Sequence, residues 1–244
     1  MKTLIIIPSR MSATRLPGKP LLKISGLSII SHVCKKAEDA NIGEVIVAAE
    51  DREIVEEVNK NGFRAILTSK THKTGTDRIY EALEKSNIKN IEFIMNLQGD
   101  EPAINVEDII NLNKKMLNKN LNLGTLAAKL KNGNDLKNEN LVKVVTDESL
   151  NKDNFPKALS FSRKSENVQN VYHHIGIYCY SKVTLEKFVK LSQSKNEIQN
   201  KLEQLRALDN DIQINVSLAK GSPIGIDTEE DYLALKKIME YNKR

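Results

Sequence analysis

A short apolar run that ends at a proline constrains the fold of this chain more than any other feature. Leu4, Ile5, Ile6 and Ile7 stand directly before Pro8. An apolar run without polar alternation is typical of a strand that is covered on both of its faces. Strands of that kind occur in parallel sheets packed between helices, so we expect an α/β fold.

The apolar spacing after this run alternates between the periods of helices and strands. It predicts helices at 28–37, 51–61, 76–84, 105–119, 183–191, 199–208 and 229–241. It predicts further strands at 44–49, 63–68, 91–97, 124–130, 141–145, 175–180 and 212–218. This order indicates a three-layer, Rossmann-like α/β fold with a mostly parallel sheet, whose ligands bind at the carboxyl ends of the strands.

The chain shows no linker or repeat, so we expect one domain over residues 1–244. The segment 149–172 is polar and poorly periodic, which indicates an inserted acceptor-side segment or small dimerisation arm around 150–195. No apolar run approaches the roughly 20 residues of a membrane span, and the first run is too short for a signal peptide. Cys34 and Cys179 lack metal or redox spacing and are interpreted as buried free thiols. A cytoplasmic protein fits these observations.

Charge is distributed unevenly along the chain. The formal net charge is +5, and residues 1–37 contain seven Lys or Arg residues but no Asp or Glu. An anionic ligand at this end is therefore expected. Aromatic residues are only 5% and Trp is absent, and no nucleic-acid-binding motif is visible, so a small phosphorylated ligand is favoured over nucleic acid.

The loop that follows the first predicted strand has the composition of a phosphate-binding loop. It carries three cations and a glycine, at Arg10, Arg15, Lys19 and Gly18. Glycine lets the backbone approach a phosphate closely, and the cations supply charge. Ala13 and Pro20 stand where a Walker loop needs Gly and Ser or Thr, and no Gly-x-Gly-x-x-Gly fingerprint follows the strand. Taken alone, the loop is equally compatible with a solvated basic turn.

Several motifs along nearly the whole chain carry a resemblance to a known family. They are the loop Ile6–Leu21, Thr74-Gly-Thr-Asp-Arg, Asn96-Leu-Gln-Gly-Asp-Glu-Pro, Val142-Lys-Val-Val, Phe161-Ser-Arg, His174-Ile-Gly-Ile-Tyr, Leu202-Glu-Gln-Leu-Arg and Gly225-Ile-Asp-Thr-Glu-Glu-Asp. In this order they resemble the CMP-sugar synthetases, which are cytidylyltransferases, and most closely the members that use 3-deoxy-manno-octulosonate (Kdo).

The resemblance implies an enzyme of nucleotidyl transfer. The anomeric hydroxyl of Kdo would attack the α-phosphorus of CTP, pyrophosphate would leave, and the CMP-Kdo would serve lipopolysaccharide synthesis. The family also implies Mg²⁺ as cofactor and a homodimer, with no nucleic-acid or membrane partner. The alternatives are another acidic sugar, such as 8-amino-Kdo or a nonulosonic acid, or a catalytically silent nucleotide-binding regulator.

Residue roles follow from the same resemblance. The implied catalytic residues are Arg10, Lys19, Asp100 and Asp227, of which Asp100 and Asp227 would hold the metal ion. The implied nucleotide-binding residues are Arg10, Arg15, Lys19, Thr74, Gly75, Thr76 and Asp77. The implied acceptor-binding residues are Gln98, His174, Glu203 and Gln204.

The residues alone also allow structural roles for several of these positions. Asp227 stands before a helix and fits a capping position, as do Thr74 and Thr76. A lone histidine such as His174 is more often structural than functional. Glu203 and Gln204 are adjacent, so on a helix they would point about 100° apart and not both face one ligand.

Two departures from the family pattern concern the acceptor side. The stretch Lys164–Asn170 is shorter than usual and lacks the family's Ile-Pro segment. His173 stands where the family usually has Arg or Lys. Both departures leave the identity of the sugar acid open, whereas the nucleotide motifs are intact.

Overall fold

The computed structural model describes residues 2–12, 15–131, 133–165 and 169–241. The described residues form two compact units. The first unit contains residues 2–91, 95–107 and the chain from 223 onward, and the second contains residues 92–94 and 108–222. The chain enters the second unit briefly at 92–94 and again at 108–222, and it returns to the first unit near the carboxyl end.

The first unit is built on strands in the order β6-β1-β4-β5, of which β6 has its residues 92–94 in the second unit. Their bounds are β1 (Lys2–Ser9), β4 (Gly43–Ala49), β5 (Ala65–Leu67) and β6 (Ile91–Asn96). Strand β1 pairs in parallel with β4, and β4 pairs in parallel with β5. The four apolar residues from Leu4 to Ile7 are 0% exposed, as expected for a strand covered on both faces.

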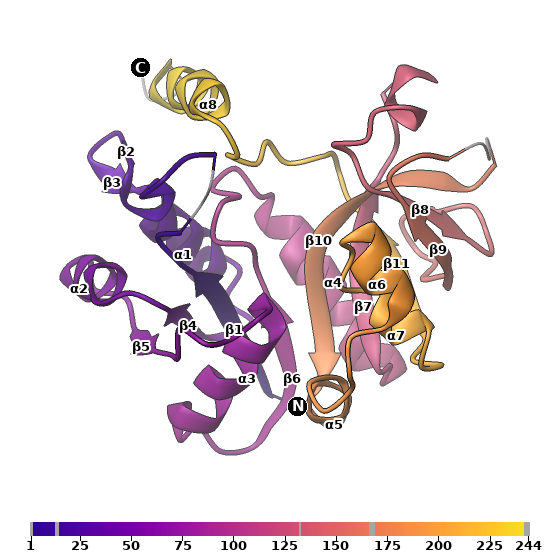
Figure 1. The fold of residues 1–244 in the computed structure, drawn as a ribbon, viewed down its shortest axis with the longest axis horizontal. Coiled ribbons are helices and arrows are strands. Elements are labelled where there is room, and N and C mark those ends of the chain that lie inside the picture. The colour runs from indigo at the N-terminus through magenta and orange to yellow at the C-terminus, as the bar shows by residue number, and fades with distance from the viewer. Residues whose placement is uncertain (1, 13–14, 132, 166–168, 242–244) are drawn as a thin grey trace. The chain divides into compact units, whose positions relative to one another are not determined.

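Helices cover the strands of the first unit (Figure 1). They are α1 (Ile29–Asp39), α2 (Arg52–Lys60) and α3 (Gly75–Ser86), all of which pack against β4 or its neighbours. A short helix η1 (Lys19–Leu21) and a hairpin of β2 (Lys23–Ile24) and β3 (Leu27–Ser28) precede α1. The last helix, α8 (Glu229–Tyr241), buries Leu235 against Ile24 and Ile29, so the carboxyl end is anchored beside the hairpin.

The second unit combines parallel and antiparallel strands. Its strands are β7 (Leu123–Ala128), β8 (Lys143–Thr146), β9 (Ala158–Ser162), β10 (Val171–Ser181) and β11 (Ile214–Leu218). Strand β7 pairs in parallel with β11 and antiparallel with β10, and β8 pairs antiparallel with both β9 and β10. The helices are α4 (Val106–Lys119), η2 (Gly133–Leu136), α5 (Lys182–Phe188), α6 (Lys195–Asn200) and α7 (Leu205–Leu208).

The α/β fold with a mostly parallel, mixed sheet is confirmed. One strand was not predicted, and one local prediction is wrong. The polar segment 149–172 contains the strand β9, which pairs along one side with β8. The helix predicted at 199–208 is two short helices, because Lys201 adopts a left-handed backbone (φ 53°) that ends α6. The single domain over 1–244, with its dimerisation arm around 150–195, stays a prediction.

Two smaller expectations concern the membrane and the cysteines. No helix of the described residues is long and apolar enough to cross a membrane. Cys34 and Cys179 are both buried free thiols, as expected. Burial raises the pKa of both thiols well above the ordinary value, which keeps them protonated and unreactive.

Candidate functional site

The basic loop after β1 is closed by its own backbone. Gly18 has a φ of +71°, and its N–H donates to the carbonyl oxygen of Met11 at 3.2 Å. A residue with a side chain rarely adopts this backbone, so the turn requires glycine. The Met11 N–H in turn donates to the Asp51 carboxylate at 2.8 Å, which ties the loop to the end of β4. These two contacts set the positions from which Arg10 and Lys19 extend.

Asp100 emerges where β6 ends, beside the end of β1. Gly99 makes this approach possible, because a Cβ atom there would lie only 2.9 Å from the carbonyl oxygen of Pro8. The Asp100 Oδ2 atom accepts a hydrogen bond from the Lys19 ammonium at 2.7 Å. The loop after β1 and the loop after β6 are therefore joined by an ion pair at the carboxyl edge of the strands.

Asp227 reaches the same edge although it follows Asp100 by 127 positions. The backbone N–H of Ile226 donates to the carbonyl oxygen of Asp100 at 3.0 Å. Lys19 Nζ donates to the Ile226 carbonyl oxygen at 2.6 Å and lies 3.5 Å from Asp227 Oδ1. Arg15 Nη2 lies 3.1 Å from Asp227 Oδ2. Two carboxylates and two cations from distant segments thus meet at one place.

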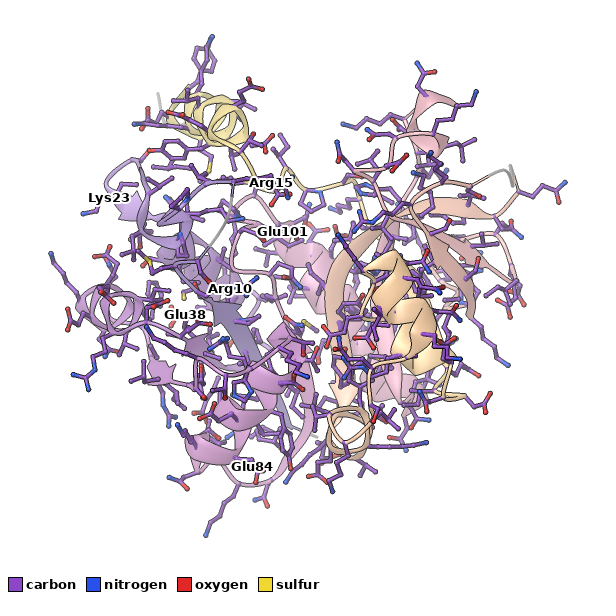
Figure 2. The ribbon with its side chains drawn as sticks, viewed as in Figure 1. Arg10, Arg15, Lys23, Glu38, Glu84 and Glu101 are labelled. Atoms are coloured by element: carbon purple, nitrogen blue, oxygen red, sulfur yellow. The ribbon has the colours of Figure 1, made fainter. Side chains whose placement is uncertain are left out.

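A cavity of about 370 Å³ lies at this edge of the first unit. Eight of the residues predicted for the site line it: Arg10, Arg15, Lys19, Thr74, Gly75, Gln98, Asp100 and Asp227. Figure 2 shows Arg10, Arg15 and Glu101 in this part of the unit, whereas Lys23 and Glu84 lie away from it. The described residues therefore place the cations, the two aspartates and one predicted acceptor residue around a common space.

Thr74 both lines the cavity and begins α3. Its Oγ1 accepts from the Asp77 N–H at 3.2 Å and donates to the Asp77 carboxylate at 2.9 Å. Thr76 is 1% exposed, and neither Thr76 nor Asp77 is among the residues that line the cavity. The capping role considered for Thr74 is therefore real, and nucleotide contacts of Thr76 and Asp77 stay predictions.

Sequence reasoning missed two residues of the loop between β5 and α3 and one residue of the first turn of α3. His72, Lys73 and Arg78 line the cavity. The position of the loop was the available signal, because it follows a parallel strand and so lies at the ligand-binding edge. His72 Nε2 forms a short hydrogen bond with Glu81, and Glu81 also accepts from the Ser69 N–H at 2.8 Å.

Arg78 fixes the start of that loop from inside the protein. Its side chain is 4% exposed and pairs with Glu50. Arg78 Nη1 donates to Thr68 Oγ1 at 2.7 Å and to the Ser69 carbonyl oxygen at 3.1 Å. A guanidinium group can make these contacts at once because its donors are fixed in a plane. Arg78 thus holds the loop rather than offering free donors to the cavity.

Glu101 is a further residue that sequence reasoning did not single out. Its Oε2 atom is buried without a hydrogen-bond partner. Burial, together with the negative charges of Asp100 and Asp227, raises the pKa of Glu101 to about 8. The excess of carboxylate groups around Lys19 shows that this position favours positive charge.

Asp100 and Asp227 are the side chains of this site that would hold a magnesium ion. Among the described residues, no group of three or more His, Cys, Asp or Glu side chains is arranged to hold a metal ion. Asp100 and Asp227, however, both lie against one cation, the Lys19 ammonium. Mg²⁺ is commonly held by one or two carboxylates, with waters and substrate phosphates completing its coordination. The two aspartates therefore fit a Mg²⁺ ion that binds together with a triphosphate.

In the second unit, His174 lies on β10 and is 7% exposed. Its ring packs edge-on against Phe161, with centroids 4.9 Å apart, and its Nε2 lies 3.0 Å from Thr125 Oγ1. The Thr125 hydroxyl donates to the Ile177 carbonyl oxygen at 2.7 Å, so the His174 Nε2 carries the proton and its Nδ1 is an acceptor. Burial and the neighbouring His173 lower the pKa of His174 to about 3, which keeps the ring neutral.

Glu203 and Gln204 lie in the turn before α7, not within a helix. Sequence reasoning assumed a helix at these residues, so the angle it used to separate them does not apply. Gln204 is the N-cap residue of α7 and is 8% exposed. Glu203 contributes to raising the pKa of Tyr178, after burial and Tyr180, and Tyr178 contacts the His174 ring at 5.6 Å between centroids. His174 and Glu203 thus share Tyr178 as a neighbour.

His173 and Lys164, which belong to the two departures on the acceptor side, both have polar partners. His173 Nδ1 hydrogen-bonds with Ser222 Oγ at 2.7 Å, at the point where the chain leaves the second unit. Lys164 forms an ion pair with Glu139. Residues 166–168 of the shortened stretch lie outside the described residues. His173 therefore has a structural partner within its own unit.

Comparison with known proteins identifies the class of protein. The model of the family described as cytidylyltransferase matches residues 4–214. The chain belongs to this family. Its curated relatives include the 3-deoxy-manno-octulosonate cytidylyltransferase of Rhodopseudomonas palustris (strain BisB18), with 40% identity over 98% of both chains. The enzyme of the same name from Bartonella henselae is 38% identical, covering 98% of this chain and 99% of its own.

Solved structures agree with this family. The structure of CMP:2-keto-3-deoxy-manno-octonic acid synthetase complexed with CTP matches with a TM-score of 0.90 and 32% identity, over 99% of this chain and 100% of the other. A 4-diphosphocytidyl-2C-methyl-D-erythritol synthase from Anaerococcus prevotii matches with a TM-score of 0.65 and 15% identity, which shows a shared fold alone.

Proposed function

We propose that this protein transfers CMP from CTP to the anomeric hydroxyl group of Kdo and releases pyrophosphate. The observation that supports the proposal best is the meeting of Lys19, Asp100 and Asp227 at the cavity beside the basic loop. Relatives that match over 98% of their length are named for this activity. A triphosphate is strongly anionic, and the lining of this cavity includes cations from the loop after β1 and Lys73 from the loop before α3.

The side chains act mainly by position and charge. Arg10, Arg15 and Lys19 would hold the triphosphate and offset the charge that develops on the leaving pyrophosphate. Little covalent chemistry is required of the protein in such a transfer, so alignment of the two substrates supplies much of the rate. We therefore expect no covalent intermediate with the enzyme.

Asp100 and Asp227 would hold Mg²⁺. When bound, the ion would supply Lewis-acid polarisation of the phosphate oxygens and neutralise part of their charge. The two aspartates provide negative charge at the carboxyl edge of the strands, directly beside the cations of the loop. The hydrogen bond from the Ile226 N–H to the Asp100 carbonyl oxygen keeps the two aspartates close together.

The acceptor would be bound by Gln98, His174, Glu203 and Gln204. Gln98 supports this assignment because it lines the cavity of the first unit. In the second unit, the neutral His174 ring keeps Nδ1 as an acceptor, which suits a sugar hydroxyl group. Amides, an imidazole and a carboxylate are the groups that recognise a polyol through several hydrogen bonds.

We further propose a cytoplasmic homodimer. The two buried free thiols need no oxidising compartment. In the segment around 150–195, Leu159 is 60% exposed on β9, which pairs only with β8 among the described strands. An apolar side chain on such an edge favours burial against a second copy. Light scattering of the purified protein measures the mass, and a monomer at micromolar concentration would contradict the dimer.

The activity is tested by pyrophosphate release from CTP and Mg²⁺ with a panel of sugar acids. The panel contains Kdo, 8-amino-Kdo and neuraminic acid, and a parallel panel replaces CTP by UTP, ATP or GTP. We expect release with CTP and Kdo above all other pairs. Preference for another sugar acid would correct the acceptor alone, and no release with any pair would overturn the enzymatic function.

A further inference from the structure

The ammonium group of Lys19 has one acceptor for each of its N–H donors. An ammonium group has three N–H donors. Lys19 Nζ has three acceptors, which are Asp100 Oδ2 at 2.7 Å, the Ile226 carbonyl oxygen at 2.6 Å and Asp227 Oδ1 at 3.5 Å. Its side chain is only 12% exposed. In this arrangement the ammonium group has no donor left for a phosphate oxygen.

The surroundings of the Lys19 ammonium are strongly acidic. Asp100, Asp227 and Glu101 come from two segments and lie close enough for their charges to act on one another. Arg15 contacts Asp227, but on its other oxygen, Oδ2. The Lys19 ammonium is thus the cation that Asp100 and Asp227 share.

A divalent cation held by both aspartates would lie next to the Lys19 ammonium, which contacts one oxygen of each carboxylate. Asp100 and Asp227 are the residues that fit Mg²⁺, and both of them contact Lys19. Two cations that share one carboxylate oxygen at these distances repel each other strongly. The Lys19 ammonium and a metal ion are therefore alternative occupants of this position.

We propose that Lys19 is an internal counter-ion that blocks the divalent-metal position of Asp100 and Asp227 until a triphosphate draws its ammonium group away. This inference rests on the proposed function, since it concerns the same site. Its consequence is an order of binding: the metal ion enters with the nucleotide, and the free enzyme holds metal weakly. The Lys19 ammonium then pairs with the aspartates in the free enzyme and with the phosphates of the nucleotide in the complex.

The first experiment measures Mn²⁺ binding to the nucleotide-free protein by the loss of the free-ion signal in electron paramagnetic resonance. Wild type is compared with Lys19→Met and with Lys23→Met, which removes the same charge from an exposed position (Figure 2). We expect Lys19→Met to bind Mn²⁺ at least about tenfold more tightly than wild type, because a competing charge is removed. Lys23→Met should match wild type. Equal Mn²⁺ affinity of wild type and Lys19→Met would overturn the proposal.

A second readout follows folding stability. Loss of the counter-ion leaves the carboxylates repelling one another, so Lys19→Met should unfold at a lower temperature without metal and gain more from Mn²⁺ than wild type does. Adding Asp100→Asn to Lys19→Met should remove this gain. If Lys19→Met does not fold, Lys19→Gln takes its place. A gain from Mn²⁺ no larger than that of wild type would contradict the counter-ion role.

The two hypotheses fail in different ways. Pyrophosphate release by wild type, together with unchanged Mn²⁺ affinity in Lys19→Met, would reject the counter-ion and keep the transferase. Tighter Mn²⁺ binding by Lys19→Met, with no turnover of wild type on any sugar acid, would keep the counter-ion and reject the transferase.

Discussion

The ion pair between Arg206 and Glu197 offers a quantitative test of how the turn carrying Glu203 and Gln204 is held. Both side chains are nearly inaccessible, at 3% and 4% exposed. Arg206 Nε donates to Glu197 Oε2 at 2.8 Å, and Nη2 donates to Oε1 at 2.5 Å. Glu197 also completes the capping box of α6 with Ser194. One pair therefore links α6 to α7 across the turn.

The Arg206 guanidinium lies over the Phe188 ring, 4.7 Å from its centroid. Replacing Arg206 by Met keeps much of this packing but leaves the Glu197 carboxylate buried without its arginine partner. Two hydrogen bonds to charged groups contribute about 1.5–3 kcal/mol each. Loss of one partner of a buried pair costs about 3–5 kcal/mol, because an uncompensated charge stays inside. For a chain of this size, that corresponds to a fall of about 6–20 °C in Tm.

The assay is urea denaturation combined with hydrogen exchange of residues 193–208, since two units need not unfold as one. Arg52→Met, at an exposed position of α2, is the control for loss of an arginine. The double variant Glu197→Leu with Arg206→Met should recover part of the stability, because it removes the stranded charge. A cost of less than about 1 kcal/mol for Arg206→Met would refute this reasoning, since that is the value of an exposed pair.

Three further predictions concern the site itself. Asp100→Asn should lower the rate of pyrophosphate release by about 100-fold or more, which is the usual effect of removing a group that stabilises the transition state electrostatically. The control Glu84→Gln, on the exposed face of α3, should leave the rate unchanged. Near-normal turnover of Asp100→Asn at saturating Mg²⁺ would remove Asp100 from the site. Gly99→Ala should lower the free energy of unfolding by about 1–3 kcal/mol and weaken CTP binding, because the added Cβ would meet a main-chain oxygen of β1. In the control Gly221→Ala the added Cβ meets nothing within 4 Å, so this variant should match wild type in thermal melting and in CTP titration. The folded-state pKa of His174, about 3, lies below its unfolded value of about 6.5, so the unfolded chain takes up a proton first. The stability of the protein should therefore fall as pH decreases from about 6.5 towards 3. His174→Gln should show a smaller loss of Tm between pH 7 and pH 5 than wild type, and an unchanged loss would contradict a neutral buried ring.

The regular elements were predictable where apolar residues report burial directly. Leu4 to Ile7 sit in a strand covered on both faces, and α1 follows the predicted apolar spacing. Strand β9 was not predictable in this way because its alternation is incomplete: Ala158 and Phe161 are buried, whereas Leu159 is exposed. The break at Lys201 was also hidden, because lysine is a good helix former and nothing nearby signals a left-handed residue.

The site was predictable in its chemistry more than in its contacts. Cations after β1 and an aspartate after β6 follow from the rule that parallel strands present their carboxyl ends together. The approach of Asp227 depends on contacts between distant segments, such as the hydrogen bond from the Ile226 N–H to the Asp100 carbonyl oxygen, which no local pattern encodes. The contacts of Lys19 with both aspartates likewise could not be predicted, because in the sequence Lys19 stands among the cations of the phosphate-binding loop.

The order of segments in the first unit bears on when the protein becomes active during synthesis. A nascent chain that has emerged as far as Ser222 already carries Arg10, Lys19 and Asp100, but it lacks Asp227. At about 5–20 residues per second, the ribosome needs about 6–25 s to advance from one aspartate to the other. Prematurely terminated products would thus carry the basic loop and Asp100 but lack the second carboxylate of the proposed metal site.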